Sequence, residues 1–193
     1  MIARRIWKDR KALSTVVATL IILVSSVVSA AAVAVYSTSL TQSRSETESL
    51  NVRLVNIWVN STVTNTPNPA VAAFVVSNTG GLQTALSSIV IRGKAVPIGD
   101  IYFWKPTVTV NSLSYSQTAL NANATAITIS VEGAGRTFTQ ATGAVGLNPG
   151  DVVVLYIDGT KTNISKSDPG TSANISLLTP NAITIAASTV ASV

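Results

Sequence analysis

Hydrophobic and polar positions divide the chain into two parts with different periods. The first is an uncharged run that begins at Leu13 and lasts until Arg44, with Val, Leu, Ile and Ala dominating as far as Tyr36. No Gly or Pro occurs before Pro67. Such a run can cross a bilayer, and there it must be helical because lipid offers no partner to backbone polar groups. We therefore predict a hydrophobic helix over residues 13–49, roughly 55 Å long.

From Leu50 onward the period changes from helical to extended. Short runs rich in β-branched and aromatic residues alternate with turn signals that contain Gly or Pro, for example at residues 78–81, 92–94, 133–135 and 148–151. This pattern favours an α+β fold, in which the long helix is followed by an antiparallel, immunoglobulin-like β-sandwich over residues 50–193. The predicted strands are residues 51–59, 71–77, 88–92, 101–104, 107–110, 126–131, 152–157, 175–178 and 182–187.

Two smaller groups of side chains belong to this two-part plan. Charged residues mark the far end of the apolar run, and we expect them to form a solvated helix end. The larger aromatic residues beyond it are expected to pack in the β domain, the alternative being an adhesive surface patch. The charged residues are Arg44, Glu46, Glu48 and Arg53, and the aromatic residues are Trp58, Tyr102, Phe103 and Trp104.

A cationic segment precedes the apolar run. Residues 1–12 hold five of the 13 Lys and Arg residues and one of the 8 acids, which leaves 8 basic against 7 acidic residues in the rest of the chain. Such a cluster stays on the cytoplasmic side of a membrane. The isoelectric point of about 9.8 therefore reflects a topology signal. It does not indicate a nucleic-acid partner, and we expect none.

The composition argues against a catalytic or metal-binding site of the common kinds. The chain contains no Cys and no His. A Ser-His-Asp triad, a Cys-His pair and a zinc site of the usual type are thereby excluded. The acids Asp100, Glu132, Asp151, Asp158 and Asp168 mostly stand beside turn residues, where Asp commonly caps the backbone. We expect no enzyme, no cofactor and no metal site.

Residues 10–23, RKALSTVVATLIIL, resemble the start of archaeal type IV pilins, the superfamily that also contains archaellins. Its members carry a class III signal peptide, a basic leader that a membrane-embedded prepilin peptidase removes just before the apolar segment. The resemblance implies a cut between Ala12 and Leu13, with Lys11-Ala12 as the recognition pair and residues 1–12 as the leader. It also implies a pilus assembly ATPase and a membrane platform protein as partners. Val17 occupies the fifth mature position, where bacterial pilins usually carry Glu.

The apolar helix carries many small side chains, which favour close packing between helices where lipid gives no hydrophobic driving force. We expect residues 13–49 to anchor the precursor in the cytoplasmic membrane and, after cleavage, to form the core of a homopolymeric filament. The chain's main partner is then itself. The packing residues are Ala18, Ser25, Ser26, Ser29, Ala30 and Ala34, with Ala31 and Ala32 beside them.

Four Asn-X-Ser/Thr sequons indicate candidate N-glycosylation sites on an exported surface. They begin at Asn60, Asn123, Asn163 and Asn174. Together with the leader, they favour the structural subunit of an extracellular type IV pilus used for adhesion. The same scaffold also serves as an archaellin in a motility filament.

Two other interpretations of the N-terminus remain open. Ala30-Ala31-Ala32 fits signal peptidase, so the segment can be a cleaved secretory signal, and an uncleaved anchor would keep residues 1–12. Either would give a membrane-anchored or secreted β-sandwich binding module that does not polymerise. Against the secretory signal, hydrophobicity resumes at residues 33–36 and helix-compatible sequence continues beyond them.

Overall fold

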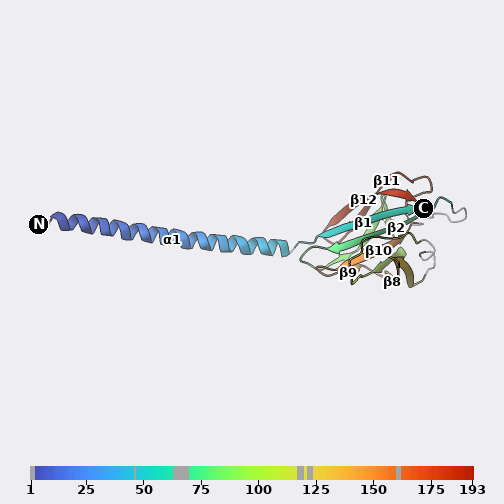
Figure 1. The fold of residues 1–193 in the computed structure, drawn as a ribbon, viewed down its shortest axis with the longest axis horizontal. Helices are drawn as coiled ribbons and strands as arrows, with labels where there is room; N and C mark the ends of the chain where they lie inside the picture. Colours follow the sequence, from blue (N-terminus) through green and yellow to red (C-terminus); the bar gives the residue numbers. More distant parts are fainter. Residues whose placement is uncertain (1–2, 46, 63–69, 117–119, 121–123, 160–161) are drawn as a thin grey trace. The chain divides into compact units, whose positions relative to one another are not determined.

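The computed structural model describes residues 3–45, 47–62, 70–116, 120, 124–159 and 162–193, and inside the helix it describes the side chains of residues 14–42. The chain divides into two compact units, residues 1–45 and 46–193, and each is described by itself. The first unit is a single α-helix, α1 (Ala3–Ser45), of 43 residues (Figure 1). At 1.5 Å per residue, it is about 65 Å long.

The second unit is built from strands, and its sheet is mostly antiparallel. Within the described part of the unit, ten strands form one sheet in the order β5-β4-β11-β12-β1-β2-β10-β6-β8-β7, while β3 and β9 form a separate pair. The one parallel pair among them joins β1 to β12 through Ile57–Val59 and Val190–Ser192. The predicted α+β fold with a sandwich-like arrangement of strands is confirmed. The strands are β1 (Leu50–Val59), β2 (Ala70–Asn78), β3 (Thr84–Leu86), β4 (Ser88–Ile91), β5 (Lys94–Val96), β6 (Ile101–Trp104), β7 (Ala126–Val131), β8 (Ala134–Gln140), β9 (Val145–Leu147), β10 (Val152–Asp158), β11 (Ser172–Leu178) and β12 (Ile183–Ser192), with a 3-10 turn, η1 (Ile98–Asp100), before β6.

The central strands β2 and β10 bury both of their faces. On one face, Phe74 and Leu155 join a core completed by β4, β11 and the end of β1. On the other face, Val75 and Tyr156 join a second core that includes Phe138 of β8. This two-sided burial explains why β2 and β10 read as nearly continuous apolar runs rather than alternating ones. The unit therefore has its own hydrophobic interior on both sides of the sheet.

The second core is closed by the segment between β6 and β7, which was predicted in part to be a strand. That prediction is wrong for residues 107–110, where no strand forms and Val108 is 54% exposed. The segment instead lies over the sheet, with Val110 and Leu113 buried in the second core. The hydroxyl of Tyr156 accepts a hydrogen bond from the Ser114 amide (3.2 Å) and donates one to its carbonyl (2.8 Å), which fixes this cover. Burial raises the pKa of Tyr156 to about 12.

Four strands, β3, β5, β8 and β9, were not predicted from the sequence. For β8 the cause is the position of the turn. Glu132 and Gly133 both have positive φ, 53° and 78°, so the β7–β8 hairpin turns at these two residues. The strand then begins at Ala134, inside the segment 133–135 that was expected to be the turn itself. The other three strands have only three residues each and lack a readable alternation.

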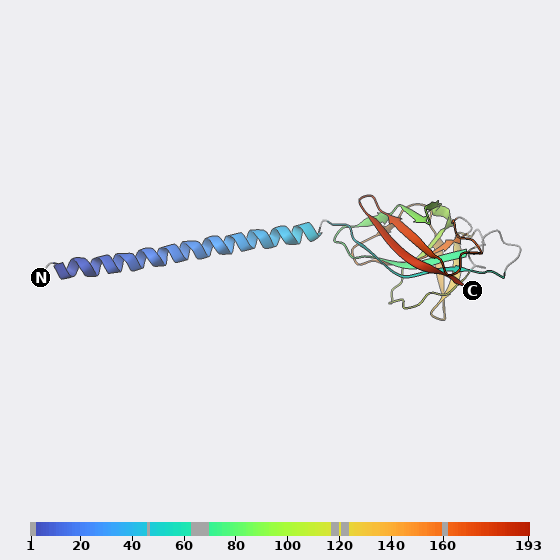
Figure 2. The ribbon, with the colours of Figure 1, turned by 90° about the horizontal axis from the view of Figure 1, so that it is seen from above.

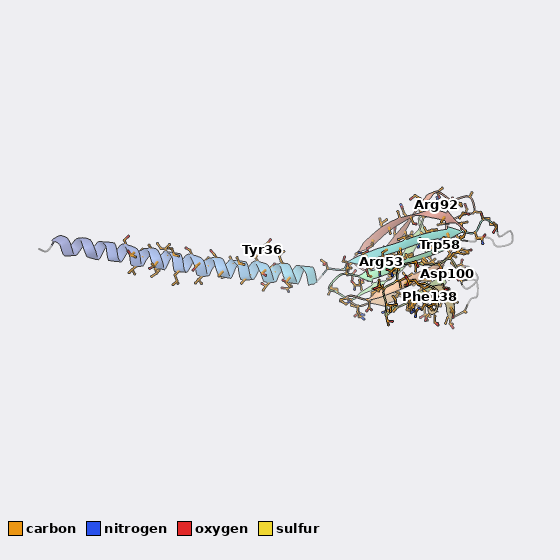
Figure 3. The ribbon with its side chains drawn as sticks, viewed as in Figure 1. Tyr36, Arg53, Trp58, Arg92, Asp100 and Phe138 are labelled. Carbon is orange, nitrogen blue, oxygen red and sulfur yellow. The ribbon has the colours of Figure 1, made fainter. Side chains whose placement is uncertain are left out.

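Aromatic side chains link the strands to the covering segment, as predicted for packing residues. Phe138 stacks edge-on against Tyr156 at a centroid distance of 5.1 Å and lies 5.8 Å from Trp104. Trp58 meets Tyr115 of the covering segment at 6.3 Å. Figure 3 shows Trp58 and Phe138 within the β unit. Tyr102 is buried, and Trp58, Phe103 and Trp104 are half-buried, so these four side chains pack inside the unit.

Candidate functional site

Between Ser14 and Gln42 the helix α1 is apolar on every side, and nothing in the described chain covers this part of it. The consecutive residues Ile21, Ile22, Leu23 and Val24 step by about 100° and so face almost all directions around the axis. The large hydrophobic side chains between Val16 and Leu40 are each 47–69% exposed. Figure 3 shows such side chains projecting from the helix, with Tyr36 labelled. A helix that is hydrophobic all round belongs inside a membrane or inside a bundle.

The length of the apolar part exceeds what a bilayer requires. Ser14–Gln42 is a stretch of 29 residues that is long and apolar enough to cross a membrane. It measures about 44 Å against a hydrocarbon core of about 30 Å. We refer to Ser14–Gln42 as the tail.

Several hydroxyl groups of the tail donate hydrogen bonds to carbonyl oxygens of the same helix. Thr19 donates to the carbonyl oxygen of Val16 at 2.9 Å, and Ser26 donates to that of Leu23 at 2.8 Å. Thr38 makes the same kind of bond to Val35 at 2.9 Å. Because these donors need no water, Ser and Thr can lie in lipid or against another helix at little cost. The scattered hydroxyl residues are therefore compatible with burial of the tail.

The small residues singled out from the sequence lie on two stripes of this helix. Ala18, Ser25 and Ser29 fall within about 40° of one another around the axis. Ser26, Ala30 and Ala34 fall within about 80° on the adjoining side. All six belong to α1, and each is exposed. Two stripes of small side chains allow neighbouring helices to approach closely on two sides.

The backbone of the predicted cleavage site is helical. Lys11, Ala12 and Leu13 lie inside α1, which begins at Ala3. Their side chains fall outside the described residues. The cut between Ala12 and Leu13 stays a prediction.

The helix ends at Ser45, four residues before its expected end. Glu48 does not belong to the solvated helix end that the sequence suggested, and it makes contacts inside the β unit. Its carboxylate accepts hydrogen bonds from the Thr179 hydroxyl at 2.8 Å and from the side-chain NH2 group of Asn181 at 3.0 Å. The bond from Thr179 is the largest cause of a lowered pKa for Glu48. These contacts fix the entry of the chain into the β unit beside the turn between β11 and β12.

A second set of contacts holds the same entry segment from the other side. The carbonyl oxygen of Ser49 accepts from the amides of Thr79 (2.8 Å) and Gly80 (3.1 Å). A Cβ atom at Gly80 would collide with the carbonyl oxygen of Thr47, so only Gly fits there. The buried Asn78 shapes this loop by donating to Leu82 at 2.8 Å. From the sequence, residues 78–81 were recognised as a turn, but their role in holding the entry segment was not.

The four sequons fall in different environments. Asn174 on β11 and Asn163 are exposed. Asn60 is half-buried, and its side-chain oxygen accepts hydrogen bonds from the Thr62 amide (3.1 Å) and hydroxyl (2.6 Å). Asn123 lies outside the described residues. Among the three described sequons, Asn163 and Asn174 are therefore the more exposed, and the Asn163 side-chain amide donates to the carbonyl oxygen of Arg92 at 3.3 Å.

The described residues hold no group of three or more carboxylates, Cys or His that could bind a metal ion. No protein-family model and no curated protein matches the sequence. Two features of the described chain stand out: the uncovered apolar tail, and the hydrogen-bonded entry segment of a β unit with cores of its own. Together they form the candidate functional site.

Proposed function

We propose that this chain is the structural subunit of an extracellular filament of the archaeal type IV pilus kind, and that it polymerises through its tail. The observation that carries the proposal is the uncovered tail, whose large side chains from Val16 to Leu40 are 47–69% exposed. Full burial of each such aliphatic side chain is worth about 1.5–3 kcal/mol relative to water. A tail left in water would therefore be strongly disfavoured.

The tail would use two environments in succession. Before assembly it lies in the cytoplasmic membrane, where its 29 uncharged residues are accommodated. After assembly it packs against the tails of other copies in the filament core. The transfer from lipid to bundle gains little from water exclusion, so close packing along the small-residue stripes supplies much of the association. Once formed, the filament would resist dissociation in water because dissociation exposes the tails.

The leader controls the change of environment. Residues 1–12 carry five basic side chains, and moving each charge through the membrane costs several kcal/mol. By resemblance to the pilins, a prepilin peptidase cuts between Ala12 and Leu13, and an assembly ATPase with a platform protein then lifts the subunit out. The cut releases the helix from its cytoplasmic anchor.

The β unit would form the outside of the filament. Its two cores give it stability of its own, and its exposed sequon at Asn163 is suited to a glycan. We propose adhesion to surfaces or other cells as the use of the filament. An archaellin would be built in the same way, and whether the filament rotates depends on a motor outside this chain.

A second candidate is a membrane-anchored β-domain module that does not polymerise. A single apolar span joined to a folded β unit supports it as well. The two candidates predict different N-terminal residues and different sizes for the released material. One experiment measures both.

Cells expressing the chain are sheared, and the released material is examined by electron microscopy and N-terminal sequencing. The filament proposal expects high-molecular-weight fibres whose subunits begin at Leu13. As matched variants, Lys11→Glu should leave an unprocessed precursor in the membrane and bare cells, whereas Lys8→Glu, further from the cut, should still give fibres. A soluble monomer beginning near Ala31 or Val33, or fibres that retain residues 1–12, would overturn the proposal.

A further inference from the structure

One face of the β unit carries an exposed apolar strip. Ile185 of β12 is 68% exposed and lies beside Ser176 of β11, which in turn pairs with Val90 of β4. One step along, Ile183 is 65% exposed and pairs with Leu178. These side chains point away from the core, which takes the alternate residues of β4 and β11. We call this face the β12 strip and define it as Val90, Leu178, Ile183, Ile185 and Ala187.

The strip is free of charge along its length. No charged side chain occurs between Pro169 and Val193, a stretch that includes β11 and β12. In addition, the pairing of β12 with β1 begins at Val190, so among the described strands the first half of β12 has a paired neighbour on the β11 side alone. Figure 2 shows the β11–β12 hairpin in red along one side of the β unit. Exposed strands usually carry charges that discourage association. This strand lacks them, which indicates a partner.

The strip lies close to the point where the tail joins the β unit. The turn before β12 holds Glu48 through Thr179 and Asn181. Glu48 is three residues past Ser45, the last residue of α1, and three extended residues span at most about 11 Å. The connection from the end of the helix to this turn is therefore short by chain length alone. If tails are bundled in a filament, a strip tethered this closely to one tail would be within reach of the tails of neighbouring copies.

Resting on the proposed filament function, we propose that the β12 strip packs against the tail of a second copy of this chain, over its residues 33–40. The two surfaces match in chemistry, since both are uncharged and carry aliphatic side chains among small residues, with Tyr36 as the one aromatic side chain of residues 33–40. Val33 and Val35 of the tail are each 68% exposed and need an apolar partner. This contact would hold each β unit against the filament core.

A glycan on Asn174 would be incompatible with this contact. Asn174 pairs with Ala187 across the β11–β12 ladder, so its side chain lies on the same face as the strip. The proposal therefore expects Asn174 to be unmodified in assembled fibres, whereas Asn163 is unconstrained. A glycan found on Asn174 of subunits in intact fibres would overturn it.

The absence of Cys makes a crosslinking test clean. Ile185→Cys is combined with a single Cys at each of residues 33–40 in turn, and fibres are oxidised with copper phenanthroline. At least one combination should give a ladder of disulfide-linked multimers in denaturing gels, and each single variant should give monomers only. Fibres that form normally but give no ladder in any combination would overturn the inference and leave the filament function intact. A disulfide-linked dimer from Ile185→Cys alone would mean that the strip packs against the same strip of a second copy, which would overturn the proposed contact with the tail.

A charge test adds an independent readout. The double variant Ile183→Lys with Ile185→Lys should lower the yield of sheared fibres at least tenfold, while the processed subunit accumulates in the membrane. Val108→Lys, at an aliphatic residue of similar exposure outside the strip, should leave the yield unchanged. Protease resistance of the β unit in membrane extracts checks that the double variant is folded. If the variant does not fold, the cysteine crosslinking experiment alone tests the contact. Equal yields from folded variant and wild type would contradict the proposal, and a wild type without fibres would refute the filament function itself.

Discussion

The tail and strand β2 are both uncharged apolar runs, and their surroundings are opposite. The β2 residues from Val71 to Val76 are all 0–1% exposed, whereas the large tail residues from Val16 to Leu40 are 47–69% exposed. Strand β2 finds its partners within the chain, in two cores on either side of the sheet. The tail finds none among the described residues. An apolar run can therefore be either buried or exposed, and the exposed tail requires a partner that the described residues do not supply.

The largest effect is expected from one charge placed in each unit. Val27 in the tail and Val108 in the β unit are similarly exposed, at 60% and 54%. Val27→Lys should abolish fibres, because a Lys at the centre of a membrane helix costs about 2.5–3.5 kcal/mol and recurs in every subunit of a packed core. Val108→Lys should leave fibre yield unchanged because that side chain stays in water. The yield of sheared fibres measures both, and equal behaviour of the two variants would remove the distinction between the units.

Much of this contrast could be predicted from the sequence. The tail was recognisable because it has 29 uncharged residues without Gly or Pro, and that pattern depends on no distant contact. The core strands β2 and β10 were recognisable for a similar reason, since two-sided burial gives a continuous run of apolar residues. In both cases local composition alone determines the element.

The entry segment and the β12 strip could not be predicted in this way. Helix-compatible sequence continues beyond Ser45, yet Glu48 and Ser49 leave the helix because Thr179, Thr79 and Gly80 supply hydrogen bonds from distant parts of the chain. The sequence predicted a strand over residues 182–187 but did not show that Ile183 and Ile185 face outward. Only the strand register shows that their neighbours Thr184 and Ala186 take the inward positions. Contacts between residues far apart in the sequence thus determine both the entry segment and the β12 strip.

A smaller effect is expected from one large side chain removed from each unit. Phe74 is 0% exposed in the first core, so Phe74→Ala should destabilise the β unit by about 3–5 kcal/mol. Leu23→Ala in the tail should leave the unfolding of the β unit unchanged, because Leu23 is 63% exposed. Urea unfolding of the processed, detergent-extracted subunit, followed by the fluorescence of Trp58 and Trp104, reports on the β unit alone. A shift of the transition by Leu23→Ala would show that the tail contributes to that unit's stability.

The smallest effect concerns acid. Asp168 accepts a hydrogen bond from the Ser165 amide at 2.7 Å and pairs with Arg92 at 2.6 Å, and these contacts, the amide first, lower its pKa below the ordinary value of 3.8. Figure 3 labels Arg92 in the β unit. A pKa lowered by folding means that ionised Asp168 adds stability above its unfolded pKa and that this stability is lost as the pH falls through the folded pKa.

Asp168→Asn should therefore reduce the loss of unfolding free energy below about pH 4, which urea titrations at pH 3 and pH 6 would measure. The reduction should be partial because Asp151, whose pKa is lowered by the Asn148 amide and by Lys105, contributes in the same direction. The tail has no carboxylate, Lys, Arg or His between Ser14 and Gln42. Wild-type fibres should consequently stay sedimentable at pH 3 while their β units become more sensitive to acid-active protease. Fibres that dissolve at pH 3 in parallel with β-unit unfolding would show that assembly depends on the ionised β unit and not on the tail.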